Sequence, residues 1–445
     1  MGARVTKRAD AEAPDADGAE PASSIAPDVA SRRQQWQRHI GVLKYSDLRI
    51  VWLAQVVSQI GDGMMTVGLV WLTLTLTGKS PSSAASLSSV LVAATLPYLF
   101  GIFTGALVDR FDRLWTMVTS DAVRGLIVLL LPAINAVTTL HVWELAVMSF
   151  FLGIAGQFFD PSKAALTPSL VPPEDLIRAN ALLTGTRQIL FVGGPAIGGT
   201  VVALAGTLGV FYVDAVSFFG SATVLLLIAR RRVKPGNAPP SSPTAGAILR
   251  DIRDGFRYLR RKRTLQAVIV VGAVLNFLLS PLPVLIPLYI KRVTKDGALQ
   301  FGSLTSIIFV GFLVGAIIVA ILGNRVGKGR LAGASIIGVG LASAGFALGL
   351  PLWPTMAIGA AGGACIGISN ISATTIVQEQ SANEFRGRVY ALYDSLAQMG
   401  RPLSLVLGAV AADAFGIRAV FLLVGLLTVI AGVPVLGVKS LRQTP

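Results

Sequence analysis

The chain has 445 residues, of which 53% are hydrophobic and only 14% are charged, and its mean hydropathy is +0.69. These values exclude an ordinary soluble domain and indicate an integral membrane protein. With one cysteine, Cys365, and two histidines, the chain lacks the residues for a disulfide framework or a clustered metal site, and we expect no cofactor and no metal. The formal net charge of +15 would fit a nucleic-acid partner in a soluble protein, so the positions of the basic residues decide its meaning.

The first forty residues are rich in Ala, Pro, Asp and Arg and contain no apolar run of the kind found in a signal peptide or a packed core. We therefore predict a disordered cytoplasmic tail over residues 1–47.

Apolar stretches long enough to span a bilayer follow in two sets of six. The first set lies near residues 48–76, 84–108, 115–137, 141–165, 179–205 and 208–230. The second set lies near residues 265–290, 300–323, 331–350, 353–377, 388–412 and 416–438. The sequence therefore predicts an all-α membrane protein with twelve transmembrane helices, in an N-terminal half over 48–230 and a C-terminal half over 265–438, followed by a cytoplasmic C-terminus over 439–445.

The segment between the halves, residues 231–264, opens with Pro, Gly and Ser and then becomes basic. Within it, Ile248, Ile252, Phe256 and Leu259 recur at helical spacing. This pattern predicts a cytoplasmic linker with an amphipathic helix at the membrane surface.

Most of the 38 lysines and arginines fall in the tail, the linker and the alternate loops that share one side of the membrane. The positive-inside rule then predicts that both termini are cytoplasmic. Topology and contact with anionic lipid headgroups account for the surplus positive charge, so we expect the bilayer and no nucleic acid as a partner.

An internal repeat relates the two halves. At one constant offset, Glu174, Arg178, Gln188 and Gly198 recur as Glu384, Arg388, Gln398 and Gly408. Both sets begin in the loop before the fifth span of their half, which favours two pseudosymmetric six-helix repeats.

A charged motif, GALVDRFDRLW, lies between the second and third spans. Glycine allows close helix approach at a tight turn, and an Asp–Arg pair at converging helix ends can hold one conformation closed. The candidate residues of this latch are Gly105, Asp109, Arg110 and Arg113. A loop that merely follows the positive-inside rule is the alternative.

The fifth span contains ILFVGGPAIGGTVV. Glycines at this spacing let helices pack closely, and proline removes a backbone hydrogen bond, so the segment can bend and seal one side of a cavity. The candidate helix-bend residues are Gly194, Pro195, Gly198 and Gly199. Ordinary packing between membrane helices is the alternative.

With the stretch from Pro161 to Gln188, these motifs resemble the major facilitator superfamily, and in particular its branch of drug and proton antiporters with macrolide-efflux proteins and the enterobactin exporter. The resemblance implies two halves that rock around a central cavity. Asp112 departs from the superfamily's loop motif. The fourth span carries Gln157 and Asp160 but no arginine, where many proton-coupled antiporters have one.

Ionisable residues inside a bilayer are costly and indicate function by default. The proton-coupling candidates are Asp62, Arg187, Asp394 and Arg401. Asp62 comes first because it lies near the middle of the first span and can exchange a proton for a cationic substrate. The alternative is a structural pair between Asp62, taken as the deepest acid of the N-terminal half, and Arg187.

Other charged residues are expected to be local. Asp121 and Arg124, three residues apart, predict an ion pair within one helix, as do Asp160 and Lys163. Asp214 is expected near the outer side of the membrane, where its carboxylate reaches water.

Polar residues on the inner faces of the spans are candidates for the wall of a substrate cavity. They are Gln55, Gln59, Thr66, Gln157, Asn180, Thr184, Asn276, Ser280, Ser369 and Gln398. For Asn276 and Ser280, which lie in a proline-interrupted span, a structural kink is the alternative. For Ser369, the alternative is hydrogen bonding between helices.

We predict a secondary transporter, not an enzyme, that exports amphipathic small molecules such as a drug, a macrolide or a secondary metabolite by alternating access with proton antiport. The expected location is a bacterial inner membrane, and the expected state is a monomer. The alternatives are a lipid or siderophore transporter of the same fold, and a membrane sensor or scaffold without transport.

Overall fold

Helices form wherever apolar and small side chains continue over bilayer length, and they break at glycine, proline and charged residues. The computed structural model describes residues 41–78, 80, 82–100, 111–230, 253–260, 262–382 and 384–437. Within these ranges the chain is almost entirely helical and has no strand, which confirms the predicted all-α class.

The first half contains five long or apolar helices and several short turns. They are η1 (Gly41–Lys44), α2 (Ser46–Thr77), α3 (Ser83–Thr95), η2 (Leu96–Phe100), α5 (Arg113–Val137), α6 (Val142–Leu166), η3 (Thr167–Ser169), η4 (Pro173–Asp175) and α7 (Leu176–Ala229). Gly206 interrupts α7 with φ 73° and ψ 174°, a conformation that glycine adopts without steric cost. The fifth and sixth predicted spans therefore lie before and after Gly206.

The second half repeats this plan with more interruptions. Its elements are α9 (Arg263–Leu279), α10 (Leu282–Tyr289), η5 (Ile290–Thr294), α11 (Ala298–Val326), α12 (Lys328–Phe346), α13 (Leu352–Gln380), α14 (Arg386–Met399), α15 (Arg401–Phe415) and α16 (Ile417–Gly437). Two predicted spans are each built from two helices, the seventh from α9 and α10 and the eleventh from α14 and α15. The proline-interrupted seventh span is thus broken after Leu279, as its sequence predicts.

Nine helices of the described chain are individually long and apolar enough to cross a membrane. One of them, Pro173–Ala229, holds two predicted spans, α3 is shorter, and α14 and α15 share a span. These elements together account for the twelve helices predicted from the sequence.

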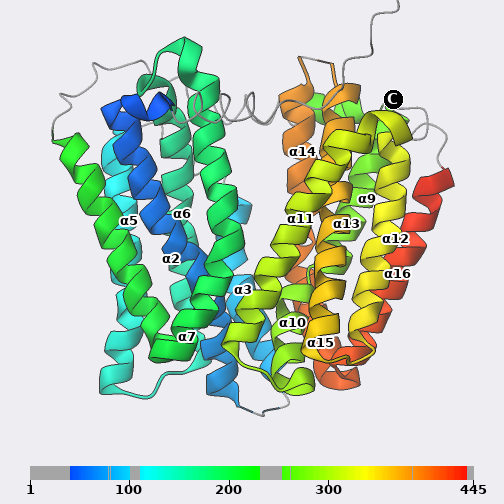
Figure 1. The fold of residues 1–445 in the computed structure, drawn as a ribbon, viewed down its shortest axis with the longest axis horizontal. Coiled ribbons are helices and arrows are strands. Elements are labelled where there is room, and N and C mark those ends of the chain that lie inside the picture. Colours follow the sequence, from blue (N-terminus) through cyan, green and yellow to red (C-terminus); the bar gives the residue numbers. More distant parts are fainter. Residues whose placement is uncertain are drawn as a thin grey trace, which may run out of the picture. The chain divides into compact units, whose positions relative to one another are not determined.

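Helices of each half pack mainly on one another. In the first half, α7 packs on α2 and α5, and α6 packs on α3 and α5. In the second half, α13 packs on α11 and α12, and α16 packs on α12. Figure 1 shows α2 to α7 gathered beside α9 to α16, with the two sets meeting at the end where α2 turns into α3.

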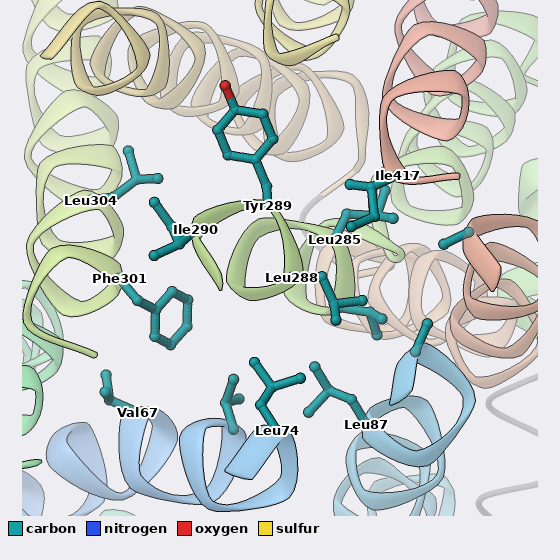
Figure 2. Packing of buried hydrophobic residues seen from close by; sticks show 14 of the residues in the cluster. Val67, Leu74, Leu87, Leu285, Leu288, Tyr289, Ile290, Phe301, Leu304 and Ile417 are labelled. Atoms are coloured by element: carbon teal, nitrogen blue, oxygen red, sulfur yellow. The ribbon is translucent and has the colours of Figure 1, made fainter. Parts of the chain in front are cut away.

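The largest apolar core joins the two halves at that end. Val67, Leu74 and Leu87 of the first half pack with Leu288 and Phe301 of the second, and all five are at most 5% exposed. Figure 2 shows these side chains converging from α2, α3, α10 and α11. Burial of this apolar surface holds the halves together there.

Parts of the predicted tail, linker and C-terminus lie outside the described residues, including 1–40, 231–252 and 438–445. Within the linker, residues 253–259 are helical. Leu259 is buried on the second half, whereas Phe256 is 46% exposed. Ile248 and Ile252, the other members of the predicted apolar face, fall outside the described residues.

Candidate functional site

A charged cluster lies between α2, α5 and the second part of α7. Arg124 of α5 places Nη2 2.5 Å from Oδ1 of Asp62 on α2, and Nη1 3.3 Å from Oδ1 of Asp121 on its own helix. The ring of Phe218 on α7 lies under the guanidinium, with the centroid 4.1 Å from Cζ. The predicted Asp121–Arg124 pair is therefore confirmed, and it extends to a second helix.

Two further polar groups of α7 complete this cluster. The hydroxyl of Ser221 donates to Oδ2 of Asp121, which is fully buried. Asp214 is also fully buried, and Ser217 donates both to its backbone oxygen at 2.8 Å and, at 3.4 Å, to its Oδ1. Among the described residues, Asp214 Oδ2 and Arg124 Nε have no hydrogen-bond partner.

Glycines create the space that this cluster occupies. A Cβ on Gly61 of α2 would lie 2.1 Å from Oδ1 of Asp214, so only glycine lets the carboxyl approach α2. Gly156 of α6 faces the guanidinium, because a Cβ there would lie 3.9 Å from Arg124 Nε. The fourth span, which carries no arginine of its own, is thus supplied with one from the third span.

The charge balance of the cluster is uneven. Three carboxyl groups, those of Asp62, Asp121 and Asp214, face one guanidinium, and only Asp62 has a side chain with substantial exposure, at 39%. Burying a carboxylate without a partner costs free energy, which a bound proton removes. Three carboxyl groups beside one guanidinium make the cluster a candidate proton site, with the Asp62 side chain as its exposed member.

Three sequence-based interpretations of these acids were wrong. Asp62 does not pair with Arg187, whose guanidinium instead lies 3.9 Å from Asp160, with both side chains more than half exposed. Asp62 is also not the deepest acid of the first half, since Asp121 and Asp214 are fully buried. Asp214, expected near water at the outer side, is fully buried, and its carboxyl packs against Gly61 of α2. The predicted Asp160–Lys163 pair is present at 2.9 Å.

The candidates of the second half do not form an equivalent cluster. Asp394 is exposed on α14 and Arg401 is half-buried at the start of α15. Within the described part of the chain, no ion pair joins them.

Several cavity candidates of the first half instead join helices. Gln55 is buried and donates to the Leu183 backbone oxygen of α7 at 2.9 Å and to Gln59 at 3.3 Å. Gln157 is buried and donates to the Pro97 backbone oxygen. Thr66 is exposed, and its hydroxyl donates to the Asp62 backbone oxygen.

The remaining cavity candidates fall into two groups. Asn180, Thr184 and Gln398 are exposed. Asn276 of α9 and Ser369 of α13 line one pocket within the second half, whereas Ser280 is buried and donates to the Asn276 backbone oxygen. The pocket is the place where sequence candidates from different helices converge.

Most of the predicted latch lies outside the described residues, namely Gly105, Asp109 and Arg110. Arg113 is described, and its guanidinium donates to the Ala165 backbone oxygen at the end of α6, 2.8 Å away. Asp112, which departs from the family motif, caps α5 by accepting from the backbone N–H groups of Leu114 and Trp115.

The glycines of the fifth span make close crossings with two helices. A Cβ on Gly194 would lie 2.5 Å from the Cα of Gly63 on α2, and one on Gly198 would lie 2.7 Å from the Met64 oxygen. Gly199 faces the other half, where its Cβ would lie 2.6 Å from the Ala298 oxygen at the start of α11. The motif is therefore part of the contact between the halves.

A hydrogen bond beside Pro195 reinforces this contact. The Ala196 backbone N–H donates to the hydroxyl of Ser306 on α11, at 3.0 Å. It links the proline-containing part of α7 to the second half.

Charged side chains of the second half also form hydrogen bonds with the start of α3 in the first half. Asp413 of α15 accepts from the backbone N–H groups of Ala84 and Ala85, in the first turn of α3, at 3.4 and 3.1 Å. Arg292 donates to the Ser80 backbone oxygen at 2.9 Å and to the Ser83 hydroxyl. An acid at a helix N-terminus is favourable because of the helix dipole.

Sequence reasoning missed the roles of Asp214, Ser221, Asp413 and Arg292. Each acts across helices that are distant in sequence, so no local spacing indicates its partner. The one available signal was a membrane-embedded acid, which flags Asp214 by residue type alone.

Comparison with known proteins places these observations in a family. The family model described as "Transmembrane secretion effector" matches residues 40–444. The chain is 27% identical over 408 residues to the multidrug efflux pump Tap of Mycolicibacterium fortuitum, covering 90% of this chain and 97% of Tap. It is 26% identical over 409 residues to macrolide efflux protein A of Streptococcus pyogenes, covering 90% and 98%.

Solved structures share the fold. A bacterial homologue of the iron transporter ferroportin, in an inward-facing state, matches with a TM-score of 0.68 at 17% identity over 88% of this chain and 98% of that one. An auto-inhibited peptide transporter of the POT family matches with a TM-score of 0.71 at 12% identity, over 90% and 97%.

Proposed function

Because the chain belongs to the transmembrane secretion effector family of the major facilitator superfamily, and is a transporter and not an enzyme, we propose that it exports amphipathic small molecules in exchange for protons. The substrate class, a drug, macrolide or secondary metabolite, follows the efflux pumps that the chain resembles. The coupling ion and the transport cycle are proposed from the site itself.

The observation that carries the proposal is the three-to-one ratio of carboxyl groups to guanidinium around Arg124. One proton on this cluster brings it closer to neutrality, and loss of that proton strengthens the attraction between Asp62 and Arg124. Since the Asp62–Arg124 pair joins α2 to α5, the protonation state of the cluster is linked to the packing of these two helices. A proton-driven conformational change needs such a link.

Alternating access is supported by the uneven contact between the halves. The apolar core at Leu74 and Leu288, the Asp413 contact with α3 and the Gly199 crossing all lie toward the end where α2 turns into α3. With cytoplasmic termini, as positive-inside charge predicts, this end is external. We infer that the described arrangement is closed outward, with the latch motif around Arg113 closing the other side later in the cycle.

The protein is a multi-pass membrane protein. We propose that it lies in a bacterial inner membrane and acts as a monomer, because both proposed elements, the charged cluster and the outer closure, are complete within one chain.

The experiment is efflux of a macrolide and dye panel from transporter-deficient bacterial cells, with and without a protonophore. Wild-type chain and the variants Asp62→Asn and Asp296→Asn are compared at equal membrane expression. Asp296 lies in the outer loop before α11, and no hydrogen bond or ion pair involves its side chain in the described chain, so it is the matched control. We expect protonophore-sensitive efflux that Asp62→Asn lowers at least about tenfold, roughly 1.4 kcal/mol of lost coupling. Efflux that persists unchanged in Asp62→Asn would refute the role of the cluster.

A further inference from the structure

The second half contains a pocket of about 110 Å³ between α9, α12, α13, α14 and α16. Its walls are mostly aliphatic, with Leu275, Ile336 and Ile366 among them. Four hydrogen-bonding side chains interrupt this apolar surface, those of Asn276, Ser369, Asn370 and Tyr393. A mainly apolar cavity with a few polar groups is typical of small-molecule sites.

The polar groups of this pocket are available to a ligand. In the described chain, the side chains of Ser369, Asn370 and Tyr393 make no hydrogen bond. Asn276 uses its Nδ2 to donate to the Gly272 backbone oxygen at 3.0 Å, which leaves Oδ1 as an acceptor. Asn276 and Asn370 are exposed and Ser369 is half-buried, so these side chains are open to a ligand that enters the pocket.

The pocket also has a clear charge preference. No Asp, Glu, Lys or Arg side chain occurs among its described lining residues. A charged group placed there would lose water without gaining a counter-charge, which is unfavourable. The pocket therefore selects uncharged groups that bear hydroxyl or carbonyl oxygens.

Its position fits a transport site. Asn276 lies one turn before the break between α9 and α10, and interrupted membrane helices border binding sites in transporters. The pocket is also smaller than the roughly 300–1,000 Å³ of a site for a whole drug-sized molecule. It is suited to one ring or sugar-sized part of a larger molecule.

We propose that this pocket is a subsite for the uncharged, hydroxyl-bearing part of the exported molecule, so that the second half recognises substrate while the first half carries the proton. This inference rests on the proposed export function and adds to it a substrate class and a location. Asn276 and Asn370 are the specificity-determining residues, because their amides can both donate to and accept from a ligand.

Equilibrium binding of radiolabelled erythromycin to the purified full-length chain in detergent tests the pocket without requiring transport. Asn276→Leu and Asn370→Leu nearly conserve volume but remove the amide. Asn135→Leu is the matched control, since Asn135 is exposed near the C-terminal end of α5 and lies outside the pocket. We expect each pocket variant to bind about five- to tenfold more weakly, the loss of roughly one hydrogen bond, with Asn135→Leu unchanged.

A labelling measurement covers the case in which the leucine variants fail to fold. Ser369→Cys in a Cys365→Ser background places the single thiol in the pocket, and bound erythromycin is expected to slow its reaction with a maleimide at least about threefold. Wild-type binding together with unchanged leucine variants, or an unprotected thiol at position 369, would overturn the subsite. Failure of the wild type to bind erythromycin would instead refute the proposed substrate class, and the subsite with it.

Discussion

Arg124 of α5 and Asp62 of α2 form an ion pair that joins two helices through the interior of the first half, with Nη2 and Oδ1 2.5 Å apart. The same guanidinium also neutralises Asp121, which is fully buried and has no exposure of its own. Arg124 therefore pairs with one partly exposed acid and one buried acid. Removing different members of the cluster is expected to have different consequences.

Arg124→Gln is expected to destabilise the protein strongly. It leaves Asp121 buried without a counter-charge, and breaking a buried ion pair in this way typically costs about 3–5 kcal/mol. We expect low membrane yield or a clear fall in the melting temperature of purified protein. Adding Asp121→Asn should restore part of the loss, because no uncompensated charge then remains at that position; a double variant less stable than Arg124→Gln would argue against this pairing.

Gly199→Ala is expected to loosen the outer closure. Its new Cβ would lie 2.6 Å from the Ala298 oxygen and 3.0 Å from the Leu299 Cα, and backbone atoms cannot give way as a flexible side chain does. In a Thr66→Cys, Cys365→Ser background, we expect faster labelling by an impermeant maleimide added outside. Gly193→Ala, on the same helix with open space at its Cβ, is the control that should leave the labelling rate unchanged.

In helices α5 and α7, the sequence predicted contacts within one helix but not contacts between helices. Helical spacing predicted the Asp121–Arg124 pair, because residues three apart share a face whatever surrounds the helix. It did not predict that Asp62 and Asp214 join them, because the rotation and height of neighbouring helices are set by packing, here by Gly61 and its contact with Asp214.

For the spans and the glycine motif, too, the sequence predicted local features but not the helices that pack together. Apolar length predicted the twelve spans, since the bilayer imposes that length locally. The motif predicted close helix crossings, yet only the three-dimensional packing shows that Gly199 meets the other half while Gly194 meets α2. The pairing of Asp62 with Arg187 failed for this reason, because Arg187 lies on an exposed face of α7.

Asp413→Asn is expected to weaken the same closure more mildly than Gly199→Ala. It removes a negative charge from the first turn of α3, where a charge–dipole interaction contributes about 0.3–1 kcal/mol. In the Thr66→Cys, Cys365→Ser background, labelling of the single introduced thiol should therefore rise no more than about fivefold. Asp296→Asn controls for loss of an acid on the same side, and equal effects of both variants would contradict a specific contact with α3.

Gly206→Ala tests the interruption of α7. Nothing lies within 4 Å of a Cβ at this position, so any effect comes from the backbone, whose φ of 73° disfavours a residue with a side chain. We expect a loss of about 1–3 kcal/mol, seen as a lower melting temperature without loss of substrate range. An unchanged melting temperature would indicate that α7 is continuous at this point.

The central claim, export in exchange for protons, is tested most directly in proteoliposomes that contain the purified chain and a pH-sensitive dye in the lumen. A labelled macrolide is supplied on one side and an inward or outward pH gradient is imposed. We predict that macrolide moves against protons, that the dye reports proton movement only when macrolide is present, and that Asp62→Asn abolishes both signals. Macrolide movement that is indifferent to the pH gradient, with no accompanying proton flux, would contradict proton antiport.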